Sequence, residues 1–201
     1  MPIRPRTRAV LLVLAALCLA PLAARAADPP PVDTLKGFGP APFGTRWEKA
    51  RSLFPKAEEV PATKNLGAPS VGGPFVHRLY LADQRVEGLP KPVDVELRFW
   101  KKRLWVVQVY WGDNAEKDVL AMLAKRLGPG QGGDGAPPLW ITDTTQTTVT
   151  PAQHTYGTSD LGLSADAQAW FKKLMKGEWR EPSQAELDEM EGRTPAPAAK
   201  P

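Results

Sequence analysis

The sequence has a single cysteine among its 201 residues. This residue, Cys18, lies in the apolar run Val10–Ala20, which has Arg4, Arg6 and Arg8 before it and Ala24-Arg25-Ala26 after it. A basic start, an apolar stretch and a small-x-small tripeptide form a secretory signal peptide, which we expect to be cleaved near Ala26. The mature chain would then contain no cysteine, which excludes disulfides, thiol catalysis and zinc–thiolate sites.

The apolar run of the signal is too short to cross a bilayer, which takes roughly 20 residues. We therefore expect a periplasmic or secreted protein without a transmembrane segment in its mature chain. Lipidation of Cys18 after a shorter signal is the alternative. Leu17 disfavours it, because bacterial lipoprotein signals carry a small residue at that place.

An excess of positive charge is also lacking once the signal is removed. The full chain has 26 basic and 22 acidic residues, a net charge of +4. The signal contains four arginines and no acidic residue, so 22 basic residues remain against 22 acidic ones. Because nucleic-acid binding depends on a basic field, we expect no nucleic-acid partner.

The familiar active-site motifs are missing as well. The chain has no G-x-S-x-G and no S-x-x-K, and its glycine-rich segment 128–135 lacks the Gly-Lys-Ser/Thr ending of a P-loop. The two histidines, His77 and His154, lie far apart without a metal-ligand spacing. The sequence therefore predicts no catalytic residue, no metal site and no cofactor.

Helix signals recur at three places in the chain. Capping boxes predict helix starts at Thr45, with Glu48 at the N3 position, and at Asp113, with Glu116 at N3. Ser164 is the expected cap of a third helix. Each start is followed by apolar residues at helical spacing, as an amphipathic helix requires.

Strand signals occupy the segments between these helices. Strict alternation marks Val93–Trp100 as the clearest strand, and Arg103–Trp111 is the strand that returns after a Lys101-Lys102 turn. We interpret the basic turn as protection of a hairpin tip. The remaining predicted strands are Phe75–Leu81, Leu139–Asp143, Gln146–Thr150 and Gln153–Thr158.

This order predicts an α+β fold, a two-layer sandwich in which two or three helices pack on a mostly antiparallel sheet. Residues 1–26 would be the signal peptide and residues 27–31 a flexible leader. Residues 32–180 would form a single α+β domain. Residues 181–201 would follow as a weak acidic helix and a disordered Pro/Ala tail.

Tryptophan is the unusual residue, with seven copies. We pair Trp100 with Arg103, since this register brings the apolar faces of both strands together. It places Arg98 opposite Trp105. The candidate binding residues on the other face are Arg98, Trp100, Trp105 and Trp111. They form either an exposed platform for sugars or peptides or a face covered by the C-terminal segment, with Trp170, Phe171 and Trp179.

Asp94 and Glu96 lie two residues apart on the face that carries these tryptophans. Two nearby carboxylates could serve a glycosidase-like hydrolase. The alternative is a solvated face, because Arg98 and Arg103 are close enough to neutralise both carboxylates.

One segment resembles a known entry motif. It is Pro42-Phe43-Gly44-Thr45, followed by Glu48, Ala50, Leu53, Phe54 and Pro55. It is similar to the start of outer-membrane assembly lipoproteins of the SmpA/OmlA (BamE) type, and closer to small exported bacterial α+β domains. The resemblance implies a scaffold of one or two helices against an antiparallel sheet, used elsewhere for binding, and implies no catalytic residues.

Three functions follow as hypotheses. The leading one is an exported, non-catalytic binding module for a protein, a peptide or an envelope glycan. The second is an envelope hydrolase that uses Asp94 and Glu96. The third is a structural accessory of an envelope complex. The sequence indicates neither the ligand nor the oligomeric state.

Overall fold

A computed structural model describes residues 31–60, 76–132, 136–176, 183 and 188. The expected signal peptide, almost all of the leader, Phe75, Trp179 and most of the C-terminal tail lie outside these residues. The helices are α2 (Trp47–Leu53), α3 (Glu116–Leu127) and α4 (Leu161–Met175), with the 3-10 turn η3 (Pro151–Gln153). The strands are β1 (Gly37–Phe38), β2 (Ala41–Pro42), β3 (Glu58–Glu59), β4 (Val76–Gln84), β5 (Val93–Trp100), β6 (Arg103–Tyr110), β7 (Leu139–Ile141), β8 (Thr145–Thr150) and β9 (Thr155–Asp160).

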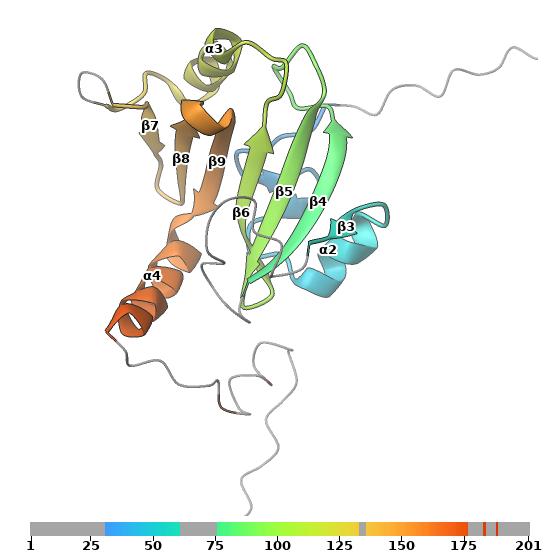
Figure 1. Cartoon of the computed structure of the whole chain (residues 1–201), viewed down its shortest axis with the longest axis vertical. Coiled ribbons are helices and arrows are strands. Elements are labelled where there is room, and N and C mark those ends of the chain that lie inside the picture. The colour runs from blue at the N-terminus through green and yellow to red at the C-terminus, as the bar shows by residue number, and fades with distance from the viewer. Residues whose placement is uncertain (1–30, 61–75, 133–135, 177–182, 184–187, 189–201) are drawn as a thin grey trace, which may run out of the picture. The chain divides into compact units, whose positions relative to one another are not determined.

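The strands form one seven-stranded antiparallel sheet and a small β1–β2 ribbon (Figure 1). The order in the large sheet is β3-β4-β5-β6-β9-β8-β7. Two meanders, β4-β5-β6 and β7-β8-β9, meet where β6 pairs with β9, and the short strand β3 pairs with the outer edge of β4. The predicted α+β class, with helices packed on a mostly antiparallel sheet, is therefore confirmed.

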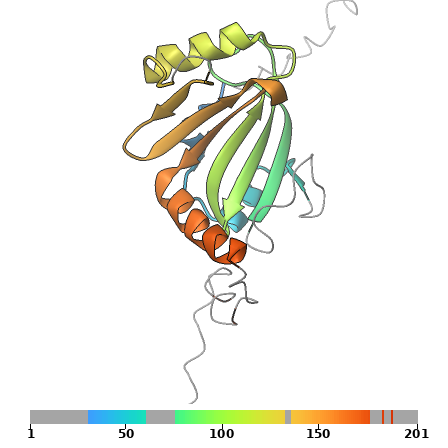
Figure 2. The ribbon, with the colours of Figure 1, turned by 60° about the vertical axis from the view of Figure 1, so that its left-hand side comes forward.

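The main core lies on one face of the sheet. The alternating residues Val93, Val95, Leu97 and Phe99 of β5 are all buried on this face, as their spacing predicts. Two helices cover it. Helix α2 contributes Trp47 and Ala50, and helix α3 contributes Val119, Met122 and Leu123. Helix α4 lies on the other face, near the end of the sheet formed by the β5–β6 turn (Figure 2).

A β-bulge at Trp105 changes the predicted pairing of β5 with β6. Trp100 pairs with Arg103 as expected, but Arg98 lies opposite Val106 and not opposite Trp105. The extra residue reverses the alternation of β6, so that Val107 joins the main core. Our unbroken register was wrong because strict alternation cannot place Leu104 on the same face as Val107 and Val109, and all three are buried.

The predicted caps were also wrong at all three helices. Helix α2 begins after Arg46 and helix α3 after Ala115, and neither has a side-chain cap. The backbone N–H of Trp47 instead donates to the carbonyl of Lys102, 2.8 Å away, which ties α2 to the β5–β6 turn. Helix α4 begins at Leu161, where Asp160 accepts a hydrogen bond from the N–H of Leu163 (2.8 Å).

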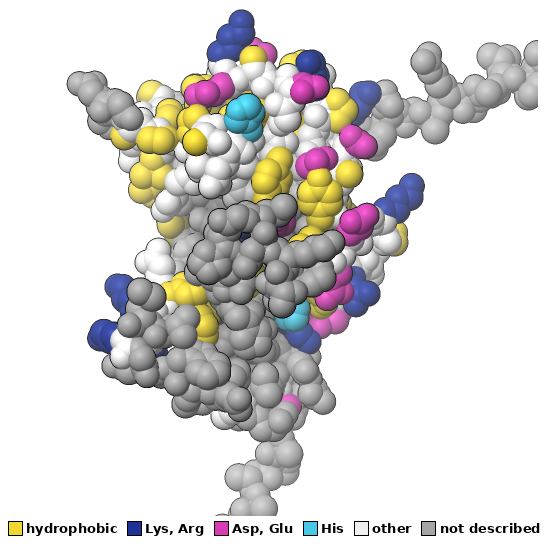
Figure 3. Space-filling view, in the orientation of Figure 1, with side chains coloured by type: hydrophobic (Ala, Val, Ile, Leu, Met, Phe, Trp, Pro, Cys, Tyr) yellow, Lys and Arg dark blue, Asp and Glu magenta, His cyan; other side chains and the backbone are white. Residues whose placement is uncertain are grey.

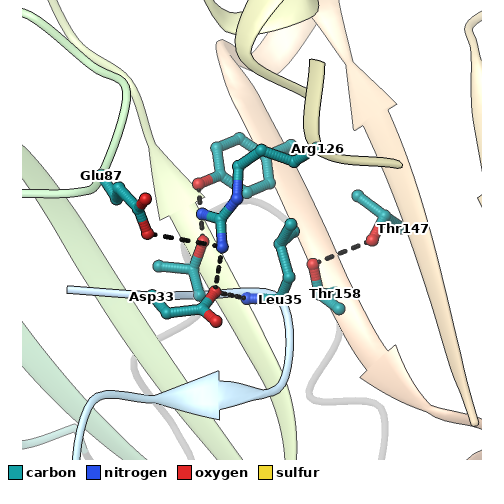
Figure 4. A network of polar contacts seen from close by, with 8 residues as sticks. Asp33, Leu35, Glu87, Arg126, Thr147 and Thr158 are labelled. Carbon is teal, nitrogen blue, oxygen red and sulfur yellow. Dashed lines mark hydrogen bonds and ion pairs between the residues drawn. The ribbon is translucent and has the colours of Figure 1, made fainter. Parts of the chain in front are cut away.

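Arg126 of α3 fastens the N-terminal segment to the core (Figure 4). Its guanidinium contacts Asp33 at 2.8 Å and Glu87 at 3.5 Å. Beside it, the hydroxyls of Thr34 and Tyr156 share a hydrogen bond of 2.9 Å. Burial is the main reason that the pKa of Tyr156 is raised, so this phenol stays neutral and can donate.

The bulge makes a prediction about two neighbouring valines. Val107→Thr places a hydroxyl among the apolar side chains of the main core, which should lower the unfolding free energy by about 1–3 kcal/mol. Val106→Thr, the matched control on the half-buried outer face, should cost less by at least about 1 kcal/mol. Urea unfolding of both variants measures the difference. A larger loss for the Val106 variant would mean that β6 pairs without a bulge.

Candidate functional site

Helix α4 buries the tryptophans at the end of the β5–β6 hairpin. Trp100 is fully buried and packs against Trp170 and Phe171, with ring centroids 5.5 and 5.8 Å apart. The ring centroid of Trp105 lies 6.2 Å from that of Trp100, and Trp105 belongs to the same cluster. Of the two sequence-based interpretations, the face covered by the C-terminal segment is the one found here.

The other two candidate binding residues lie elsewhere. Trp111 is buried in the main core, because the bulge moves it to that face, and its ring stacks on His154 at 5.9 Å. Arg98 makes no pair with Trp105. Its Nε donates to Glu96 at 2.6 Å. The four residues therefore do not form one platform, and the alternative of an exposed aromatic surface is wrong, since Trp100 and Trp111 are buried.

Two indole N–H groups attach α4 to the hairpin. Trp100 Nε1–H donates to Asp166 (2.7 Å) and Trp105 Nε1–H donates to the hydroxyl of Ser164 (2.8 Å). Ser164, which we predicted as a helix cap, thus binds a tryptophan. Burial opposes the ionisation of Asp166, but hydrogen bonds from Trp100 and Lys101 outweigh it and lower the pKa of this carboxyl.

The turn that follows Trp100 has an unfavourable backbone. Lys101 and Lys102 have φ values of 46° and 58°, both left-handed. A two-residue hairpin turn of this kind favours Asn-Gly, and a side chain there costs roughly 1–2 kcal/mol per residue. Lys101 contacts Asp166 (3.1 Å) and Lys102 contacts Glu48 of α2 (3.4 Å). The acidic partners thus connect the strained turn to both neighbouring helices.

A cleft of about 280 Å³ lies beside this turn, and we name it the turn cleft. It lies between the start of α2, the β5–β6 turn and the first part of α4. Four basic and two acidic side chains line it, with Trp100 and Leu163 as apolar lining. The residues are Arg46, Glu48, Trp100, Lys101, Lys102, Arg103, Leu163 and Asp166.

Two of the basic residues lie directly opposite each other. Arg46 and Arg103 form an antiparallel bridge. The flanking hydrogen bonds, Trp47 N–H to Lys102 and Leu104 N–H to Thr45, identify it as the pair type whose side chains are closest. Both arginines are exposed, and no carboxylate of the described residues lies within ion-pair distance of either. Elsewhere, acidic and basic side chains are intermixed along one edge of the face in Figure 3.

Asp94 and Glu96 lie on the outer face of β5, where Asp94 is half-buried and Glu96 is shielded from solvent. Glu96 is fully buried and accepts hydrogen bonds from Arg98 and from the hydroxyl of Tyr110 (3.1 Å). Asp94 accepts one from Tyr80. Burial raises the pKa of Tyr110, and Glu96 raises it further, so the phenol remains a donor. The expected neutralisation by Arg103 is wrong, since that residue lines the turn cleft.

The two histidines contact different tryptophans, His77 packing on Trp47 and His154 on Trp111. Burial lowers the pKa of His77, which packs on Trp47 at 5.0 Å, and Lys102 lowers it further. Among the described residues, no group of three or more His, Cys, Asp or Glu side chains could bind a metal ion. No helix in the same residues is both long and apolar enough to span a bilayer.

Comparison of the chain with protein-family models, with curated proteins and with solved structures finds no match.

The sequence pointed to only part of the turn cleft. Trp100 was a candidate, and Lys101, Lys102 and Arg103 were noted but interpreted as protection of a hairpin tip. Two lysines at hairpin positions that favour Asn-Gly were the available signal. Nothing local could have indicated Asp166, because it reaches Trp100 across 66 residues of sequence.

The lowered pKa of Asp166 makes a pH prediction. A carboxyl with a lowered folded pKa stabilises the fold above its unfolded pKa, about 3.9. That stabilisation is lost as the pH falls through the folded value. The difference in unfolding free energy between the wild type and Asp166→Asn should therefore shrink from pH 7 to pH 3. Asp143→Asn, at an exposed turn, serves as the control. An unchanged difference for the Asp166 variant would contradict the assignment.

Proposed function

We propose that this protein is an exported, non-catalytic binding module that takes the anionic part of an envelope ligand into the turn cleft. The observation that supports it is the set of side chains around the cleft. Four cations face two carboxylates there, and two of the cations, Arg46 and Arg103, have no acidic partner among the described residues. Polar and charged groups that converge on a concave site fix the orientation of a ligand and provide specificity.

The size of the cleft favours a small ligand or one group of a larger one. About 280 Å³ lies just below the range of roughly 300–1,000 Å³ that is typical of drug-sized ligands. Envelope glycans and acidic peptides both present small anionic groups on a larger body. The location of the protein outside the cytoplasm is the premise that connects the cleft with such ligands.

Binding is favoured over the hydrolase hypothesis by the state of the two carboxylates. A hydrolase needs one carboxyl as an acid and the other free to act as a base or a nucleophile. Glu96 is instead buried in contact with Arg98 and Arg78, and Asp94 accepts from Tyr80. No specific observation favours the structural-accessory hypothesis.

The proposal can be tested with immobilised protein and an envelope extract separated by anion exchange. We expect saturable binding of acidic fractions and little binding of neutral ones. Lys101→Ala/Arg103→Ala should weaken this binding at least tenfold, since it removes two of the four cations of the cleft.

The matched control is Lys117→Ala/Lys125→Ala, which removes the same charge from the exposed face of α3. It should bind like the wild type. An equal loss in both double variants would indicate attraction by general charge, and tight binding of neutral fractions would overturn the role of the cleft.

A further inference from the structure

We propose that the group recognised in the turn cleft is a phosphate, either the free ion or the phosphate monoester of a sugar. The inference rests on the proposed function and names the chemistry of its ligand. Three observations carry it: an unneutralised arginine pair, a strained lysine turn, and the balance of charge in the cleft.

The arginine pair is the strongest of these observations. Arg46 and Arg103 face each other in the bridge geometry that brings side chains closest. Like charges directly opposite each other destabilise a strand pair. A dianion between the two guanidiniums would turn this repulsion into attraction. Guanidinium also presents a planar fork of N–H donors that matches two phosphate oxygens at once.

The lysine turn adds donors that are already in place. Lys101 and Lys102 are both left-handed and both line the cleft. A strained backbone conformation persists only where contacts with the surrounding structure enforce it, and such residues are frequent at ligand sites. Asp166 and Glu48 contact the two ammonium groups. These carboxylates limit the freedom of the lysines in the absence of ligand, so that less entropy is lost when an anion binds.

The charge of the cleft selects between anions. The four basic residues exceed the two acidic ones by two charges. A phosphate monoester carries about −1.5 to −2 at pH 7 and offers three acceptor oxygens. A carboxylate carries one charge and two oxygens, so it neutralises only one of the two guanidiniums and offers fewer acceptor oxygens. The cleft therefore matches phosphate better than acetate-like groups.

Isothermal titration calorimetry with inorganic phosphate, glucose 6-phosphate and acetate at equal ionic strength tests the inference. We expect one site per chain for the two phosphates and at least tenfold weaker binding of acetate. Arg46→Gln and Arg103→Gln should each weaken phosphate binding about tenfold or more, since each removes charge-assisted hydrogen bonds. Both side chains are exposed, so these variants should fold, which circular dichroism checks. Lys117→Gln/Lys125→Gln should bind phosphate normally.

The measurements distinguish free phosphate from a sugar phosphate, and the phosphate inference from the proposed function. Tighter binding of glucose 6-phosphate than of the free ion would assign a sugar phosphate, and equal or weaker binding would assign the free ion. Acetate binding as tight as phosphate binding overturns the inference, and so does binding only to phosphatidylglycerol vesicles. If phosphate fails while acidic extract fractions still bind through the cleft, the proposed function stands and only the phosphate is wrong. If both fail, both are wrong.

Discussion

The hydrogen bond from the indole of Trp100 to Asp166 is the contact on which the site depends. A buried indole N–H needs an acceptor, since leaving it unpaired costs about 1–3 kcal/mol. Asp166 of α4 supplies that acceptor at 2.7 Å. The same carboxylate contacts Lys101. Asp166 thus holds α4 over the aromatic cluster and also lines the turn cleft.

The bulge at Trp105 is the second constraint. It places Trp105 and Trp111 on opposite faces of the sheet, although strict alternation puts both on one face. The bulged residue itself, Trp105, faces α4. After it, Val107, Val109 and Trp111 join the main core. Without the extra residue these three would lie on the outer face, and the core beside α3 would lose them. The tryptophans of this hairpin are therefore mostly structural, and the charged turn beside them carries the binding proposal.

The regular elements could be predicted from the sequence because their signals are local. The alternation of Val93–Trp100 gave the exact bounds of β5, and the two meanders were evident from turns and spacing. The pairing of β6 with β9 could not be predicted, since it joins segments that are far apart in the chain. The bulge was missed because a strict period of two assumes an unbroken ladder.

The candidate site was only partly predictable for a related reason. Residue types indicated Trp100 as a binding candidate. Its burial, however, depends on α4, whose Asp166 lies 66 residues further along the chain. The cap predicted for α2 failed because the backbone of the β5–β6 turn, and no side chain, satisfies the first N–H of that helix. Arg46 had no distinctive sequence signal at all. It belongs to the cleft because the segment before α2 pairs with the start of β6.

In the proposal made above, the β5–β6 turn, α2 and α4 together form an anion site. A nuclear magnetic resonance titration of the isotope-labelled protein with inorganic phosphate examines this site residue by residue. We expect saturable shifts at the amides of Lys101, Lys102 and Arg103 and at the indole N–H of Trp100, with none along α3. Shifts that are spread over the surface, or that concentrate away from the turn cleft, would contradict it.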